Sequence, residues 1–236
     1  MIVERAEHPS WLSNAYLVAD EVGGSGVLID GNGVTEPLLE RVERDRLAVT
    51  HVLCTHEHGD HVVGVAEMAD RFGAPLVLPG DLSDDDVLRT NGLEIRALDT
   101  PGHATGHFTF LVNDTDCFTG DVLFKGTVGG TRGGGPTGFA DLKRSIMERL
   151  MRLEPATRIH PGHRDPTTVA EEWESNPFVR VWRGVEPEQA GRCRVQGEEA
   201  TLVLWAPDYD GGHKAWVRFP SGADMIVGGS QVEREP

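Results

Sequence analysis

Cysteine is scarce in this sequence. The 236 residues include three, Cys54, Cys117 and Cys193, an odd number without Cys-x-x-Cys spacing. Such usage is typical of a reducing compartment and argues against a disulfide framework. The sequence also lacks apolar runs of membrane length, and residues 1–5 do not begin a secretory apolar core. We therefore expect a soluble cytoplasmic protein without a membrane partner.

Basic residues are also few. Lysine and arginine total 22 against 38 aspartate and glutamate residues, which gives a formal net charge of -16. Nucleic acid or an anionic membrane would be repelled, because no compensating basic patch stands out. Bound metal ions would add local positive charge, so a small anionic substrate remains open as a partner.

One stretch is unusually rich in metal-binding side chains. Residues 55–61 read Thr-His-Glu-His-Gly-Asp-His and follow the apolar run 48–54. In an extended segment His56 and His58 leave the backbone on the same side and can reach one ion. A turn after Gly59 would aim Asp60 and His61 at a second ion. Neutral imidazole and carboxylate suit zinc, iron or manganese.

Further metal-capable residues follow later strands. His103 ends the turn sequence Thr-Pro-Gly-His at 100–103, which the proline and glycine favour. Asp121 follows Gly120 after an apolar segment, and His163 follows the short strand predicted at 158–160. These spacings predict ligands presented at several strand ends.

These segments together resemble the metallo-β-lactamase superfamily, and more closely its glyoxalase II-like branch. The matching segments are T-H-E-H-G-D-H (55–61), T-P-G-H (100–103), F-T-G-D-V-L-F (118–124) and H-P-G-H (160–163). The resemblance implies an α/β protein with a four-layer αβ/βα sandwich and two divalent metal ions, with zinc expected and iron or manganese as alternatives. It implies a first metal site of His56, His58 and His103 and a second of Asp60, His61 and His163, bridged by Asp121.

The periodicity of the chain supports an α/β organisation. Residues 1–184 are predicted to form the catalytic domain, and residues 185–236 a small β-rich extension that serves dimer contact or shapes the substrate entrance. One helix is predicted to begin near Thr35, and a second to span 63–72. A third is predicted from Leu142 to Leu153 along one apolar stripe, and a fourth to begin at Thr168. Strands are predicted at 14–18, 26–30, 48–54, 93–98, 108–112, 117–119, 158–160, 191–195, 200–205 and 214–219.

The predicted chemistry is hydrolysis. Two ions about 3.5–4 Å apart can share a hydroxide, which would attack a small thioester of the glyoxalase II kind. Asp60 would orient that hydroxide or return a proton to the leaving group. Lys125, Arg132 and His107 are candidate substrate-binding residues. The glycine-rich residues 126–138 lack the Gly-Lys-Ser/Thr ending of a phosphate loop and favour a mobile active-site loop.

Two other classes remain open. A persulfide dioxygenase-like oxidoreductase would use a single iron with a similar set of first-site ligands. A non-enzymatic metal-binding or interaction protein would use the β-rich extension as its functional part. Lactamase activity is disfavoured by Asp121 and by the missing secretion signal, and nuclease activity by length and charge.

Overall fold

The computed structural model describes residues 1–133 and 136–234. The described chain forms two compact units, each built from separate segments. The first unit comprises Met1–Asp99, Gly106–Gly120 and His160–Arg164, and the second comprises Thr100–Thr105 and the described residues of Asp121–Ile159 and Asp165–Pro236.

The first unit begins with a mixed sheet of order β1-β2-β3-β5-β6. The first three strands pair antiparallel, whereas β5 pairs parallel with both β3 and β6. The strand bounds are β1 (Ile2–Glu7), β2 (Asn14–Ala19), β3 (Ser25–Ile29), β5 (Ala48–Leu53) and β6 (Leu76–Val77). Parallel strands present their carboxyl ends at one edge, so the segments after β3 and β5 emerge together.

A second set of strands in this unit is antiparallel throughout and has the order β10-β9-β8-β7. Its bounds are β7 (Val87–Arg89), β8 (Glu94–Asp99), β9 (Phe108–Val112) and β10 (Asp116–Gly120). The last residues of β13 (Arg158–Pro161), His160 and Pro161, lie beside β10 and lead the chain to His163.

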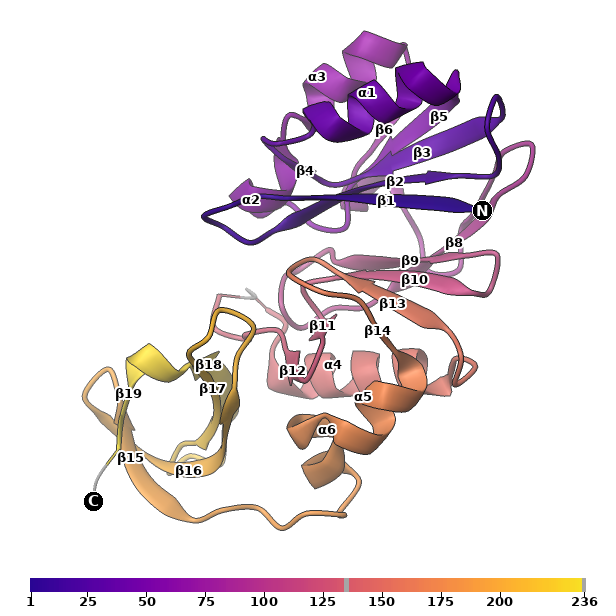
Figure 1. The fold of residues 1–236 in the computed structure, drawn as a ribbon. Coiled ribbons are helices and arrows are strands. Elements are labelled where there is room, and N and C mark those ends of the chain that lie inside the picture. Colours follow the sequence, from indigo (N-terminus) through magenta and orange to yellow (C-terminus); the bar gives the residue numbers. More distant parts are fainter. Residues whose placement is uncertain (134–135, 235–236) are drawn as a thin grey trace. The chain divides into compact units, whose positions relative to one another are not determined.

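Alternation along the first sheet creates two apolar cores. On β2, Leu17 faces helices α1 (Glu36–Asp45) and α3 (Val65–Phe72), which cover one face of the sheet (Figure 1). Its neighbours Tyr16 and Val18 face the opposite way and pack against Phe110 and the rest of the antiparallel strands. The first unit therefore has a helix layer and two sheet layers.

The helix ends agree largely with the sequence pattern. Gly73 ends α3 in the left-handed conformation with φ of 61°, directly after the helix predicted over 63–72. Thr35 precedes α1, but its side chain makes no capping hydrogen bond. The remaining short elements of this unit are β4 (Gly31–Asn32), α2 (Gly59–Val62) and a 3-10 turn at Pro79–Asp81.

The second unit contains the other helices. The predicted stripe at Leu142, Ile146 and Leu150 is buried, but the segment is not one regular α-helix. It begins as α4 (Phe139–Arg144), passes through a π turn (Ser145–Arg149) and ends in a 3-10 turn (Leu150–Arg152). The other elements are α5 (Val169–Ser175), α6 (Pro177–Trp182), β11 (Leu123–Phe124), β12 (Thr127–Val128) and β14 (Thr167–Thr168). Thr168 caps α5 by accepting from the Glu171 amide, as predicted.

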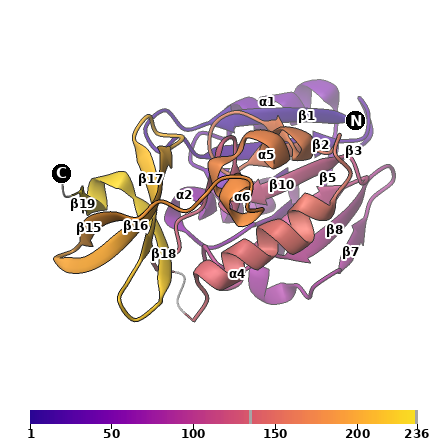
Figure 2. The ribbon, with the colours of Figure 1, turned by 90° about the horizontal axis from the view of Figure 1, so that it is seen from below.

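The end of the chain is a sheet of order β18-β17-β16-β15-β19, which we call the C-terminal sheet (Figure 2). Its strands are β15 (Gly191–Val195), β16 (Glu198–Pro207), β17 (His213–Arg218), β18 (Asp224–Gly228) and β19 (Val232–Arg234), with a 3-10 turn at Gly229–Gln231. It has its own apolar core around Val217 and Val227. The predicted β-rich character is observed, and the domain boundary at 184–185 stays a prediction.

The mixed α/β fold class predicted from the sequence is confirmed. Within the described residues, no helix combines the length and the apolar character needed to cross a membrane.

Candidate metal centre

The segment after β5 is held by a buried carboxylate. Asp30 directly follows β3, is 2% exposed and has a positive φ of 59°. It accepts hydrogen bonds from the Thr55 amide at 2.7 Å and from Thr55 Oγ1 at 2.8 Å. The parallel pairing of β3 and β5 brings these residues together, although they lie 25 positions apart. The start of the predicted metal-binding segment is thereby fixed to the sheet edge.

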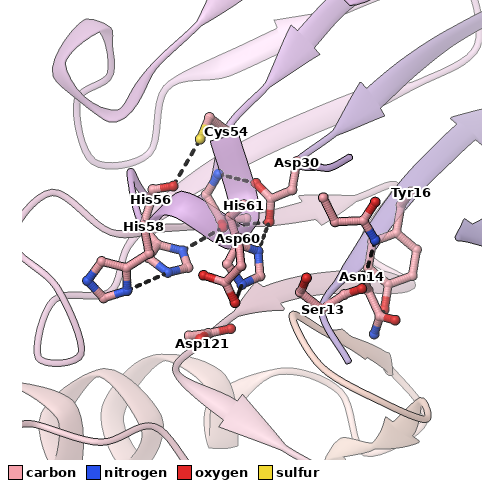
Figure 3. A network of polar contacts seen from close by, with 12 residues as sticks. Ser13, Asn14, Tyr16, Asp30, Cys54, His56, His58, Asp60, His61 and Asp121 are labelled. Carbon is pink, nitrogen blue, oxygen red and sulfur yellow. Dashed lines mark hydrogen bonds and ion pairs between the residues drawn. The ribbon is translucent and has the colours of Figure 1, made fainter. Parts of the chain in front are cut away.

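Asp30 also orients a predicted ligand. Nδ1 of His61 lies 3.1 Å from Asp30 Oδ2, and both side chains are buried (Figure 3). A carboxylate at one imidazole nitrogen fixes the tautomer and leaves the other nitrogen for a metal. Nε2 of His61 points toward Asp60 Oδ2 at 3.7 Å. Asp30 was not among the predicted site residues, although a carboxylate directly after a buried strand was an available signal.

Asp60, His61 and His163 come together within the first unit. One ligand atom from each lies within 4.8 Å of the others. His163 Nε2 is 3.5 Å from Asp60 Oδ2, while its Nδ1 contacts the Trp11 carbonyl oxygen at 3.1 Å. With bonds of about 2.0–2.1 Å, two ligand atoms of a tetrahedral ion lie roughly 3.4 Å apart. The donor types and spacings therefore fit a metal ion.

The turn that carries His163 is anchored to β2. Tyr16 donates its hydroxyl to the Pro161 carbonyl at 2.7 Å, and Asn14 Nδ2 donates to the same oxygen at 2.9 Å. Asn14 Nδ2 also reaches the Arg164 carbonyl at 2.8 Å. Two buried polar side chains of one strand thus define the path of the chain on both sides of His163.

His56 and His58 form the second pair in this unit. His56 Nε2 lies 3.1 Å from His58 Nδ1, so the two nitrogens face the same point (Figure 3). His56 Nδ1 contacts Thr55 Oγ1 at 3.0 Å. Since that hydroxyl donates to Asp30, it can accept from His56, and Asp30 thereby orients His56 indirectly. The sequence expectation of two imidazoles on one side of the segment agrees with this geometry.

The second unit contains the other two predicted ligands. His103 Nε2 is 3.6 Å from Asp121 Oδ2, and His103 Nδ1 contacts the Gly130 carbonyl at 2.9 Å. His103 therefore has the same arrangement as His61 and His163, with Nδ1 held by an oxygen and Nε2 beside a carboxylate. Asp121 is 6% exposed, so its carboxylate is largely withdrawn from water.

The predicted substrate-binding residues have different surroundings. His107 is fully buried, and its ring stacks on that of His56 at 4.9 Å. Lys125 is exposed and lies 3.8 Å from Glu171, and the exposed Arg132 donates to Gln231 at 2.7 Å. Their contact with substrate stays a prediction. Residues 134 and 135 of the predicted mobile loop lie outside the described residues.

Imidazole and carboxylate groups that follow strands of a mixed α/β fold define a candidate metal-binding site. A match to the Metallo-beta-lactamase superfamily covers residues 9–84. The hydroxyacylglutathione hydrolase GloC of Haemophilus influenzae is 30% identical over 211 residues, which cover 76% of this chain and 98% of that protein. The chain belongs to the metallo-beta-lactamase superfamily, whose members are generally hydrolytic and typically bind two divalent metals.

Solved structures agree with this assignment. ETHE1 from Myxococcus xanthus superposes with a TM-score of 0.71 at 29% identity, covering 77% of this chain and 85% of that one. TTHA1623, solved in a di-iron-bound form, superposes with a TM-score of 0.62 at 30% identity, covering 74% of this chain and 99% of that one. The likeness confirms the predicted sandwich fold.

Proposed function

We propose that this protein is a metal-dependent hydrolase of small thioesters. The observation that carries the proposal is the shared arrangement of three histidines, His61, His103 and His163. Each has Nδ1 within hydrogen-bonding distance of a protein oxygen and Nε2 beside a carboxylate. This arrangement directs Nε2 toward a metal ion, so the histidine rings need little reorientation when the ion binds. The similarity to a hydroxyacylglutathione hydrolase supports the substrate class.

The proposed ligand sets are those expected from the sequence. His56, His58, His103 and Asp121 would hold one ion, and Asp60, His61, His163 and Asp121 the other. We expect zinc, with iron or manganese as alternatives. The di-iron form of TTHA1623 supports iron as one of these alternatives. Bound ions would lower the pKa of water and polarise the substrate carbonyl.

Asp60 is the proposed catalytic residue of the chain itself. Its side chain is 30% exposed, whereas those of its neighbours His61 and His163 are buried. A carboxylate that reaches solvent from such a site can orient the attacking water and accept its proton. The same group can pass a proton toward the departing thiolate, although a thiolate leaves without strong acid assistance.

The thiol carrier of the substrate is a separate question. Tyr16 is 3% exposed and its hydroxyl is engaged by Pro161, so this residue serves the fold and is unsuited to gripping glutathione. The other tyrosine, Tyr209, packs against Phe124 at 4.8 Å between ring centres. Lys125 and Arg132 are the proposed local cations. We therefore propose a small thioester as the substrate, and its thiol is to be identified by experiment.

A substrate panel tests this proposal. Thioesters, phosphodiesters, lactones and lactams are assayed on metal-loaded protein whose metal content is measured beforehand. We expect about two ions per chain and turnover on a thioester. One iron per chain with oxygen uptake on persulfides would instead establish the dioxygenase-like alternative. Metal binding without turnover on any substrate would favour the non-enzymatic one.

Two accompanying proposals concern the environment of the protein. We propose a cytoplasmic location, which suits three cysteines that form no disulfide in the described chain.

We also propose a homodimer formed through the C-terminal extension at 185–236. Sedimentation of the full chain over a range of concentrations tests the dimer, and a monomer at every concentration would refute it.

A further inference from the structure

The outer edge of the C-terminal sheet is bonded to one residue of the glycine-rich segment. Within the sheet order, β18 is a terminal strand. Both backbone polar groups of Ile226 in this strand bond Thr131. The Thr131 amide donates to the Ile226 carbonyl at 2.9 Å, and the Ile226 amide donates to Thr131 Oγ1 at 2.9 Å. Thr131 is 7% exposed, so both hydrogen bonds are shielded from water.

Thr131 directly follows two residues that contact the predicted ligands. The Gly130 carbonyl lies 2.9 Å from His103 Nδ1. Gly129 packs so closely on Asp121 that a Cβ at this position would lie 2.0 Å from the Asp121 carbonyl oxygen. Three consecutive residues therefore contact Asp121, His103 and the C-terminal sheet in turn. A displacement of Thr131 would be passed to its neighbours through the backbone.

The start of this segment is fixed separately. Glu172 accepts from the Gly126 amide at 2.9 Å, and Asn176 donates to the Thr127 carbonyl at 3.2 Å. These bonds from the α5–α6 region hold the β11–β12 hairpin. The Thr131–Ile226 pair holds the other end of the same segment, beyond the residues that contact the ligands.

A second contact joins the C-terminal sheet to the His103 turn. Trp216 of β17 packs on Phe139 of α4 at 4.8 Å between ring centres. The same helix supports the turn, because a Cβ at Gly102 would lie 2.3 Å from the Leu142 amide nitrogen. Gly102 has φ of +133°, which L side chains rarely adopt. The sheet thus supports both the turn that carries His103 and the carbonyl that orients its ring.

We propose that the C-terminal sheet positions His103 for metal binding and that Thr131 is the positioning residue. This goes beyond the dimer and substrate-entrance roles expected from the sequence, and it rests on the proposed function in taking His103 as a ligand. A carbonyl held at Nδ1 fixes the Nδ1–H tautomer and directs Nε2 to the ion. Without the Thr131 hydroxyl, the Ile226 amide loses its acceptor, and the Gly130–Thr131 peptide is held to β18 by one hydrogen bond in place of two.

The experiment compares three variants of the full chain. Thr131→Val removes the hydroxyl at nearly constant volume, and Thr131→Ser retains it. Thr201→Val makes the same change at an exposed residue of β16 in the same sheet. The His103 ring is followed by nitrogen NMR in the metal-free protein, and metal affinity by competition with a chromophoric chelator. If Thr131→Val folds poorly, Thr131→Ala, which leaves room for a water at the Ile226 amide, replaces it.

We expect Thr131→Val to alter the tautomer signature or speed the exchange of the His103 Nδ1 proton, and to weaken one metal site by about tenfold, the lower end for residues that orient ligands. Thr131→Ser and Thr201→Val should match wild type in both readouts. An unchanged His103 ring, or a changed ring with unchanged affinity, would overturn the inference. If wild type bound no metal, the proposed function would fail, while the metal-free ring signal would still decide whether Thr131 positions His103.

Discussion

The carboxylate of Asp30 lies 3.1 Å from Nδ1 of His61, and the same oxygen accepts from the hydroxyl of Thr55. One buried oxygen therefore orients two predicted ligands, His61 directly and His56 through Thr55. Because these histidines belong to different proposed metal sites, the two sites share a common support.

Asp30→Asn should weaken metal binding at both sites by about 10–100-fold. The amide has a single oxygen, so it cannot accept from the Thr55 amide on one side and from Thr55 Oγ1 and His61 on the other, as the two carboxylate oxygens do. Metal affinity is measured by chelator competition. Asp114→Asn, at an exposed side chain, is the control and should bind as wild type does. Equal affinities in the two variants would show that Asp30 only supports the fold.

His58→Ala should lower turnover by more than about a hundredfold, because a lost ligand costs more than a lost orienting residue. The ring is only partly buried, so the free energy of unfolding should change by about 0.5 kcal/mol or less. His51→Ala, at a half-buried position in β5, is the matched control and should retain activity. Full activity in His58→Ala would remove this residue from the mechanism.

Glu172 gives the protein a predictable pH dependence. Burial raises the pKa of its carboxyl above the ordinary value, against the hydrogen bonds from Asn176, Thr167 and Gly126 that lower it. The native state therefore binds its proton more tightly than the unfolded state does, and stability falls as pH rises from the ordinary glutamate range through the raised pKa.

Glu172→Gln should remove this component, since the amide can still accept from Gly126 and donate to Thr167. Urea unfolding between about pH 4 and 7 measures it. The wild-type protein should lose stability relative to the variant as pH increases. A constant difference between the two across this range would show that Glu172 has the same pKa in both states.

The cysteines should be inert in the native protein. Burial raises the pKa of the Cys54 and Cys117 thiols, so neither forms appreciable thiolate near pH 8. Cys193 is 2% exposed. A thiol reagent should therefore react with none of the three in minutes, and with all three after unfolding in guanidinium. Rapid reaction of Cys54 in the folded state would indicate that the segment after β5 opens.

The proposed ligand residues could be selected from the sequence because their side-chain chemistry is local and specific. Two imidazoles two positions apart at the end of an apolar strand are typical of a metal site, and the turns before His103 and His163 were legible from proline and glycine. The three central strands of the first sheet, β2, β3 and β5, were also predicted from the sequence, since β-branched and apolar residues there alternate between two cores.

The contacts that could not be predicted from the sequence join residues that are distant in the chain. Asp30 meets His61 across 31 positions, and Thr131 meets Ile226 across 95. Neither residue type is distinctive by itself, so only the folded chain reveals their roles. The irregular helix after Phe139 was missed for another reason, because its apolar stripe is nearly the same in α, π and 3-10 geometry.

The hydrogen bond from Tyr16 to the Pro161 carbonyl joins residues 145 positions apart in the sequence, and most of the first unit lies between them along the chain. Contacts of such separation form late, because the chain must close a long loop before they stabilise it. The turn bearing His163 should consequently dock after the sheet around β2 has assembled. Metal binding by Asp60, His61 and His163 would then become possible only at the final stage of folding. Metal added at successive times during refolding would show when this stage is reached.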